Sequence, residues 1–284
     1  MNLWRLLDTV CDAALALAYP RACSACGVAQ VEQRADAPAC AACWAATRLF
    51  GAGQVLCAKC GAPAPGTAAT GRGASAPVAS VAVAPVAVTA GPGDEAVPGD
   101  ETEAAPGTGA TVRCRRCEAE AFTAARACGP YAGALRAAVL ALKHEPFVGR
   151  RLALLLEETQ ARPPLDAVTL VVPAPLHPER ERERGFNQAA LLAAALAKRT
   201  GLALDGHSLV RVAHAGRHRA GMDARARRET VEGAFEVVRP RLVAGERVLL
   251  VDDVLTTGAT ASACAAALRA AGASEVFVLT VARA

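Results

Sequence analysis

The sequence predicts an α/β protein in which a doubly wound, mainly parallel sheet follows a small cysteine-rich module. Eight of the eleven cysteines fall into four C-x2-C pairs before residue 118. From residue 128 onward, apolar runs of strand length alternate with helical segments, which implies parallel strands joined by crossover helices. One of these strands leads into two carboxylates and a Thr- and Gly-rich turn. Ligands of doubly wound proteins bind beyond the carboxyl ends of the strands, where this turn is expected to lie.

The composition is that of a folded protein with a substantial core. The chain has 284 residues, of which 53% are apolar and 20% are charged, enough for one domain and a smaller module. A formal net charge of +4 is too small to indicate nucleic-acid binding by itself. No apolar run reaches the roughly 18 residues that a membrane span needs, so no span is expected.

Residues 1–20 are expected to form an amphipathic helix, because their leucines recur at intervals of three and four. Asp8 and Asp12 interrupt what could be the apolar core of a signal peptide. A signal peptide is the alternative interpretation. The helical interpretation predicts a cytoplasmic protein with reduced thiols.

The cysteine-rich module, residues 21–61 and 113–120, has the spacing of a double zinc ribbon. Thirteen residues separate Cys26 from Cys40, and thirteen separate Cys43 from Cys57. Gly27 and Gly61 follow two of the pairs, as in zinc knuckles. Four thiolates favour tetrahedral Zn²⁺ and leave no open position, which predicts two structural zinc ions. The expected ligands are Cys23, Cys26, Cys40, Cys43, Cys57, Cys60, Cys114 and Cys117.

Sequential pairing of these ligands, four from each half of the module, is the simplest arrangement, and interleaved pairing is the alternative. Redox C-x2-C motifs or an iron–sulfur site are further alternatives. Cys11, Cys128 and Cys264 have no partners at metal-ligand spacing, and are expected to be small buried apolar residues.

Residues 62–112 are predicted to be a disordered insertion between the third and fourth cysteine pairs. They contain no Leu, Phe, Tyr, Trp, Met, Cys or Lys, and hold seven of the seventeen prolines. Such a segment cannot bury enough apolar surface to offset the entropy lost on ordering.

Residues 128–284 are predicted to form the α/β domain. Helices are expected over residues 131–143, 148–160, 187–200 and 260–271, and strands over 168–172, 248–251 and 276–281. Asn187 is the expected N-cap of the third helix and Gly201 its C-cap. Pro173 is expected to stop the first strand.

The segment 248–260 has the pattern of a sugar-phosphate site. A buried strand reaches Asp252 and Asp253, and the turn Thr256, Thr257, Gly258, Ala259, Thr260 then opens a helix. Such a turn offers backbone N–H groups and the positive helix end to a phosphate. The two carboxylates suit vicinal ribose hydroxyls or a sugar-bound Mg²⁺. The sequence therefore predicts a pocket for a ribose 5-phosphate.

The segment 248–260 resembles the PRPP-binding motif of type I phosphoribosyltransferases, where PRPP is 5-phosphoribosyl 1-pyrophosphate. Other parts of the chain resemble the ComF family. They are the double zinc ribbon, Leu142-Lys143, Val171-Val172-Pro173-Ala174-Pro175-Leu176-His177, Arg180 and Arg184-Gly185-Phe186-Asn187-Gln188. The resemblance implies a type I phosphoribosyltransferase fold with Mg²⁺ and PRPP as ligands. It implies that Asp252 and Asp253 bind ribose hydroxyls, that residues 256–260 surround the 5′-phosphate, and that the loop after Val172 faces pyrophosphate.

Further substrate-binding candidates are Lys143, Arg180, Arg184 and Asn187, and Asp252, Asp253 and Arg184 are candidate catalytic residues. Arginines next to a proline-stiffened strand end suit an anion. The alternative for Arg180 and Arg184 is an exposed charged turn, because acidic residues alternate with them.

Two departures from the related families concern the acceptor. Thr256 stands where purine-salvage phosphoribosyltransferases carry an aspartate, so a base for a purine proton is missing there. Arg219 and Thr230 stand where ComF proteins are expected to have Gln and Asn. The basic segment 211–228 has no interleaved aromatic residue; it could bind a single strand, close over pyrophosphate, or be solvated.

The function expected from these observations is binding or transfer of a 5-phosphoribosyl group with pyrophosphate release, linked by the resemblance to competence and DNA uptake. The alternative is a non-enzymatic zinc-ribbon scaffold that binds a competence helicase, a recombination protein or single-stranded DNA.

Overall fold

The computed structural model describes residues 20–51, 54–63, 113–212 and 233–284. The expectations for the N-terminal helix, for Cys11, for nearly all of the proposed insertion and for basic residues 213–228 therefore lie outside the described residues.

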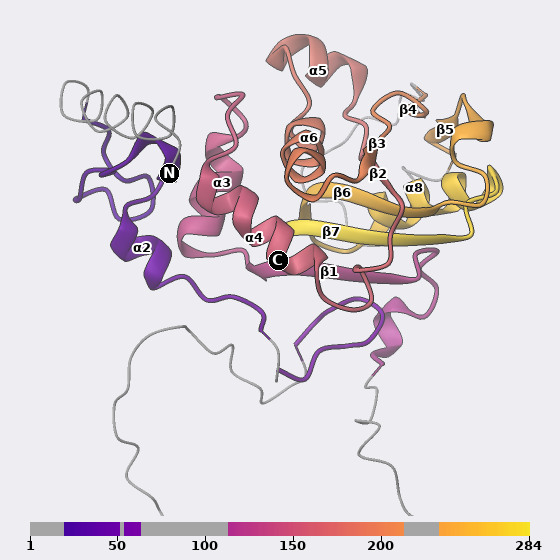
Figure 1. Cartoon of the computed structure of the whole chain (residues 1–284), viewed down its shortest axis with the longest axis horizontal. Helices are drawn as coiled ribbons and strands as arrows, with labels where there is room; N and C mark the ends of the chain where they lie inside the picture. Colours follow the sequence, from indigo (N-terminus) through magenta and orange to yellow (C-terminus); the bar gives the residue numbers. More distant parts are fainter. Residues whose placement is uncertain (1–19, 52–53, 64–112, 213–232) are drawn as a thin grey trace, which may run out of the picture.

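A five-stranded parallel sheet forms the centre of the molecule (Figure 1). Its strands are β1 (Ala124–Pro130), β2 (Leu170–Pro173), β3 (Ala203–Leu204), β6 (Arg247–Leu255) and β7 (Glu275–Arg283). Their order is β1-β7-β6-β2-β3, and every neighbouring pair is parallel. This arrangement confirms the predicted α/β class with a parallel sheet.

Helices cover both faces of the sheet, as a doubly wound fold requires. They are α3 (Gly133–Ala141), α4 (Arg150–Gln160), α6 (Gln188–Thr200) and α8 (Ala259–Ala270). Side chains along β6 alternate between two cores: Leu249 and Val251 pack with α3, α4 and α6, whereas Val248 and Leu250 pack with α8.

The ends of α6 follow the capping residues identified from the sequence. The Asn187 side chain accepts a hydrogen bond from the backbone N–H of Ala189 at 2.9 Å, and Gly201 ends the helix with φ of 74°. An N-cap acceptor and a left-handed C-cap satisfy orphan backbone groups at both ends.

Several element boundaries differ from the prediction by one or more residues, and three of the differences have a structural cause. β6 continues through the acidic pair to Leu255 because Asp252–Leu255 pair with the last residues of β7. β2 includes Pro173, which follows the last residue of the predicted strand. β1 begins at Ala124, before the expected domain start at 128, and pairs only with β7 at the edge of the sheet.

Several short elements complete the described fold. They are η1 (Arg34–Asp36), α2 (Ala41–Ala45), η2 (Arg115–Cys117), α5 (Pro178–Arg184), η3 (Pro240–Leu242) and an antiparallel hairpin of β4 (Leu209–Arg211) with β5 (Phe235–Val237). The hairpin lies on the α8 side of the sheet, since Leu209 and Phe235 belong to the core that α8 covers.

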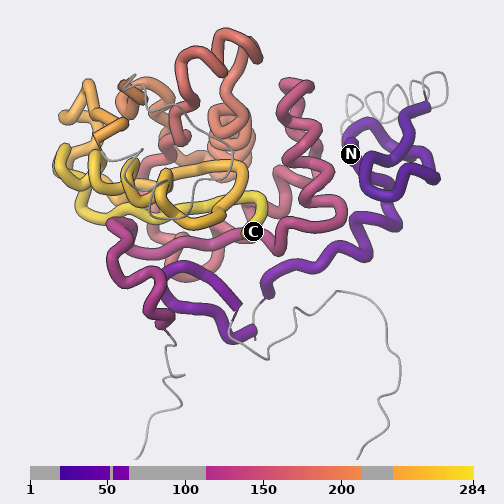
Figure 2. The backbone as a smooth tube through the Cα atoms, turned by 180° about the vertical axis from the view of Figure 1, so that it is seen from behind, coloured from indigo at the N-terminus to yellow at the C-terminus, as the bar shows by residue number. Residues whose placement is uncertain are grey.

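The two cysteine-rich segments occupy different places on the α/β domain. Residues 20–51 lie beside α3, whereas residues 54–63 and 113–120 lie next to β1, as both views show (Figures 1 and 2). None of the helices within the described residues is long and apolar enough to cross a membrane.

Candidate functional site

The acidic pair lies where β2 leaves the sheet. β2 pairs with β6 only as far as Val251, and the N–H of Ala174 donates to the carbonyl of Val251 at 2.9 Å. Beyond that point β6 keeps its partner β7, and no strand of the described ranges pairs with it on the β2 side. Asp252 and Asp253 therefore stand at the carboxyl edge of the sheet, where doubly wound folds bind ligands.

The two carboxylates of this pair differ in environment. The pKa of Asp252 is raised to about 8, mainly by burial and also by the negative charge of Asp253. The N–H of Asp253 donates to the Asp252 carboxylate at 2.8 Å and opposes the rise. A half-buried carboxyl next to another acid gains from a cation or from hydroxyl donors, because either stabilises its charged form.

The turn after β6, residues 256–260, is the segment for which the sequence predicts phosphate binding, and we call it the phosphate loop. Gly258 is the N-cap of α8 with φ of 87°, a left-handed conformation that favours glycine. The Thr257 hydroxyl accepts a hydrogen bond from the N–H of Ala259 at 3.3 Å. Thr256 is exposed, and Thr260 lies in the first turn of the helix. The structure thus brings the loop and the acidic pair together on consecutive residues.

Arg180 and Arg184 lie on the helix α5 and not in the loop or charged turn that the sequence predicts. His177 caps α5, and Gly185 ends it with φ of 77°. Arg180 is exposed and Arg184 is half-buried in the last turn. A proline at the start and a glycine past the end are the sequence signals for this helix.

Arg211 on β4 belongs to the same region as Arg180. Its guanidinium lies 5.4 Å from the ring centre of Phe235. Burial lowers the pKa of Arg211, and the positive charge of Arg180 lowers it further. The positive charge of Arg180 on α5 therefore acts on Arg211 on β4, which the sequence alone did not reveal.

Asn187 and Lys143, two further candidate binding residues, lie on other elements than the acidic pair, at the start of α6 and after α3. The Asn187 amide donates to the carbonyl of Ala174 at 3.0 Å while its oxygen caps α6, so it fixes the loop after β2. Lys143 lies in the turn after α3. Among the described residues, no hydrogen bond or ion pair joins Lys143 to the acidic pair or to the phosphate loop.

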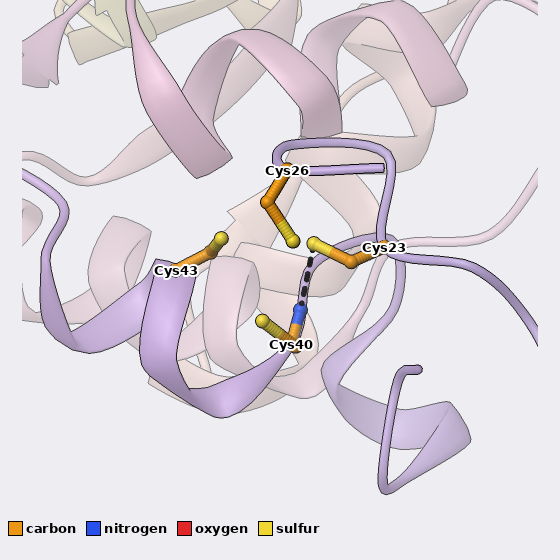
Figure 3. Close-up of side chains that lie close together, drawn as sticks. All are labelled: Cys23, Cys26, Cys40 and Cys43. Carbon is orange, nitrogen blue, oxygen red and sulfur yellow. Dashed lines mark hydrogen bonds between the residues drawn. The ribbon is translucent and has the colours of Figure 1, made fainter. Parts of the chain in front are cut away.

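The first four cysteines, Cys23, Cys26, Cys40 and Cys43, converge on one point (Figure 3). Their sulfur atoms lie within 4.8 Å of one another, close to the edge of about 3.8 Å that a Zn–S bond of about 2.3 Å implies for a tetrahedron. Burial raises the pKa of Cys23, but backbone N–H donors, that of Cys40 among them at 3.2 Å, lower it to about 6.

The second group repeats this geometry with Cys57, Cys60, Cys114 and Cys117. Its sulfur contacts include 3.6 Å from Cys57 to Cys117 and 3.5 Å from Cys60 to Cys114. Burial raises the pKa of Cys57, while N–H donors that include Cys114 lower it to about 6. The pairing is therefore sequential, with two separate four-cysteine clusters consistent with two zinc sites.

Both knuckle turns have the same backbone pattern. The N–H of Gly27 donates to the carbonyl of Cys23 at 2.8 Å, and that of Gly61 donates to Cys57 at 2.9 Å. Both glycines have positive φ, 72° and 67°. Glycine at this position lets the chain curl so that N–H groups approach the thiolates, as the spacing predicted.

The second cluster is attached to the sheet by main-chain hydrogen bonds and by arginines. The N–H of Ala125 on β1 donates to the Lys59 carbonyl at 2.6 Å, and Arg283 on β7 donates to the Cys60 carbonyl at 2.7 Å. Burial lowers the pKa of Arg126, and the nearby thiolates of Cys57 and Cys60 oppose this. These arginines offset the negative charge of four thiolates around a divalent ion.

Cys128 and Cys264 are buried, with relative exposures of 1% and 0%. Burial raises the pKa of both thiols, which keeps them neutral. The expectation that they are small buried apolar residues is confirmed.

Comparison with protein families matches two parts of the chain. Residues 14–74 match the double zinc ribbon domain, and residues 187–284 match the phosphoribosyl transferase domain. Cys114 and Cys117 lie outside both matches, and the structure adds them to the second cluster. The class is thus a double zinc ribbon joined to a phosphoribosyltransferase domain.

Characterised relatives cover part of the chain. Competence protein F of Haemophilus influenzae is 33% identical over 138 residues, which are 48% of this chain and 60% of the relative. DNA utilization protein YhgH of Escherichia coli K12 is 35% identical over 133 residues, 46% of this chain and 57% of the relative. Competence protein ComFC of Bacillus subtilis is 36% identical over 91 residues, 32% of this chain and 34% of the relative. The chain therefore spans 60% or less of the length of these relatives.

Two solved structures are similar to part of the α/β domain. Glutamine PRPP amidotransferase from Bacillus subtilis, in complex with ADP and GMP, is 24% identical with a TM-score of 0.31, over 45% of this chain and 25% of that chain. Hypoxanthine phosphoribosyltransferase from Staphylococcus aureus is 17% identical with a TM-score of 0.29, over 45% of this chain and 61% of that chain.

Proposed function

We propose that this protein binds PRPP with Mg²⁺ at the carboxyl edge of its sheet and transfers the phosphoribosyl group with release of pyrophosphate. The observation that carries the proposal is the continuity of β6, the loop and α8. Two acids on a buried strand lead directly to a left-handed Gly258 that caps a helix of 12 residues. Acids for ribose hydroxyls and N–H groups for phosphate then lie a few residues apart.

Each group of the chain has a role in this reaction. Residues 256–260 would hold the 5′-phosphate through backbone N–H groups and hydroxyls. The acidic pair would accept hydrogen bonds from the ribose hydroxyls, and Arg180 and Arg184 would neutralise the departing pyrophosphate. When bound, Mg²⁺ supplies further positive charge to the pyrophosphate.

In the transfer, the bond from C1 of the ribose to the pyrophosphate oxygen breaks, and pyrophosphate leaves with the electron pair. The acceptor's lone pair forms the new bond to C1, and the acceptor loses its proton. Thr256 replaces the aspartate of purine-salvage enzymes, so we assign no general base from this chain.

A competition experiment tests the recognition step. Ribose 5-phosphate should displace a labelled PRPP analogue from the protein, whereas free ribose should not. A screen for pyrophosphate release with nucleobases and amines would then identify the acceptor. Displacement by free ribose as strong as by ribose 5-phosphate would contradict the assigned phosphate loop.

The names of the relatives, competence protein and DNA utilization protein, support a role in DNA uptake, and we propose that the protein acts in the cytoplasm, where thiols stay reduced for zinc. Under this proposal a competence helicase or recombination protein is the expected protein partner.

A cleft beside α4 and α6 favours a second candidate function, a scaffold that binds single-stranded DNA. The cleft has a volume of about 770 Å³ and is lined by Phe147, Arg150, Lys198 and Arg199 among others. Phe147 is 51% exposed. An exposed aromatic ring beside cationic side chains suits base stacking and phosphate contacts.

Fluorescence anisotropy with a labelled thymidine oligonucleotide tests this candidate. The double variant Phe147→Ala, Lys198→Ala should weaken binding by about tenfold or more, because stacking on one aromatic ring contributes about 1–3 kcal/mol. The control is Arg241→Ala, Leu242→Ala, which removes an exposed cation and an exposed apolar side chain elsewhere. Equal binding by both double variants would exclude this cleft.

A further inference from the structure

The segment between the second cysteine cluster and β1 is fastened to α8. The N–H of Ala121 donates to the Ser262 hydroxyl at 2.8 Å. Arg269 donates to the Ala121 carbonyl at 2.9 Å and to the Thr123 hydroxyl at 2.7 Å. Three hydrogen bonds thus hold residues 121–123 along the helix that begins at the phosphate loop.

These contacts place Glu120 beside the phosphate loop. Glu120 follows Cys117 by three residues, and its N–H donates to the Cys117 carbonyl at 3.2 Å. Its side chain is buried, with a relative exposure of 7%. A Cβ atom built on Gly258 would lie 3.5 to 3.7 Å from the three carboxyl atoms of Glu120.

The space at this point is accessible. A cleft of about 530 Å³ runs along α8 from Ala259 to Ala270, and Glu120, Ser262 and Phe235 are among the residues that line it. A carboxylate therefore lies at the end of the helix that attracts anions, beside the N–H groups that would hold a ligand's phosphate.

We propose that Glu120 is a built-in competitor for the phosphate of the ligand, held against Gly258 by the second cysteine cluster. The inference rests on the proposed function, because it concerns the same phosphate loop. A carboxylate and a phosphate dianion repel each other when both lie beside Gly258. The phosphate must therefore displace the Glu120 carboxylate. By holding Glu120 in place, the second cysteine cluster lowers the affinity of the loop for phosphate.

The direction in which phosphate affinity changes when Glu120 is replaced distinguishes competition from a purely structural role. If Glu120 merely supported the loop, its loss would weaken phosphate binding. If Glu120 competes, replacing its charge by a neutral amide of nearly the same shape should strengthen binding.

The experiment is calorimetric titration of the full-length, zinc-loaded protein with ribose 5-phosphate, comparing wild type with Glu120→Gln. We expect Glu120→Gln to bind about tenfold more tightly, since one unit of like charge is removed next to the phosphate. The matched control is Glu118→Gln, which removes the same charge from an exposed position two residues earlier and should change the affinity less than about twofold.

Glu120→Asp is a second variant that keeps the charge and shortens the side chain by one methylene, and it should give a smaller gain than Glu120→Gln. Unchanged or weaker binding by both Glu120 variants, with wild-type binding intact, would overturn this inference and leave the proposed function standing. Absence of ribose 5-phosphate and Mg-PRPP binding in all variants and in wild type would overturn both.

Discussion

Asp252 lies on a buried strand whose environment opposes its negative charge. Burial and the negative charge of Asp253 together raise its pKa to about 8. The unfolded chain would release this proton near pH 4. Between these values the folded protein holds a proton that the unfolded chain has lost, so the contribution of Asp252 to stability falls as the pH rises from about 4 to about 8.

Replacing Asp252 by Asn should reduce this pH dependence. In ligand-free protein, urea unfolding should show the Asp252→Asn variant more stable than wild type by about 1–3 kcal/mol near pH 8.5, with a smaller difference near pH 5. Asp166→Asn, a change at an exposed acid, is the control. A wild-type stability that rises through this pH range relative to Asp252→Asn would contradict the assigned environment.

Gly258 supplies a second prediction for a single residue. Its φ of 87° is strained for any side chain, so Gly258→Val should cost about 1–2 kcal/mol of stability and abolish ribose 5-phosphate binding. Gly201→Val is the matched control, since Gly201 has φ of 74° and open space around it. Gly201→Val should lose similar stability and keep the ligand. Equal binding by the two variants would show that Gly258 is not at the phosphate site.

Among the elements, α6 was predicted from local signals, whereas β1 and the last residues of β6, which depend on a partner strand, were not. α6 carries an Asn N-cap and a Gly C-cap in its own sequence, and both are confirmed. β1 lacks β-branched residues and is a strand because β7 lies beside it. β6 extends past the acidic pair for the same reason.

The candidate site likewise contains residues that are neighbours in the sequence and residues that only the fold brings together. The acidic pair and the loop are consecutive in sequence, so their proximity follows from chain connectivity. The approach of Glu120 to Gly258 and of Arg180 to Arg211 depends on tertiary packing, and no spacing rule predicts it.

The two cysteine clusters are separate elements and should hold metal independently. Wild type should contain about two zinc ions per chain by elemental analysis, and Cys26→Ser or Cys114→Ser should each retain about one, because each cluster has its own four ligands. Iron in place of zinc, or loss of both ions from a single substitution, would contradict this assignment.

At the scale of the whole molecule, the ribbons are parts of the domain cores. Cys23, Cys40 and Trp44 belong to the core that α3 and α4 cover, whereas Cys57, Cys60 and Cys117 belong to the core that α8 covers. Metal binding should therefore stabilise the α/β domain as well as the ribbons, since metal-binding free energy adds to folding free energy.

The long segment between Cys60 and Cys114 should be dispensable for folding. These two sulfur atoms lie 3.5 Å apart, so a short link can join the flanking residues. Replacing residues 64–112 by a Gly/Ser linker should leave two zinc ions bound and lower the melting temperature by no more than a few degrees. A large drop, or loss of the second zinc, would show that the segment packs on the fold.

The central claim is that the acidic pair and the loop after β6 form a PRPP site, and calorimetric titration with Mg-PRPP tests it most directly. Zinc-loaded wild type should bind about one PRPP per chain. The double variant Asp252→Asn, Asp253→Asn should bind at least about a hundredfold more weakly, since each charge-assisted hydrogen bond contributes about 1.5–3 kcal/mol. Wild-type affinity in the double variant, or no binding by wild type, would contradict the account.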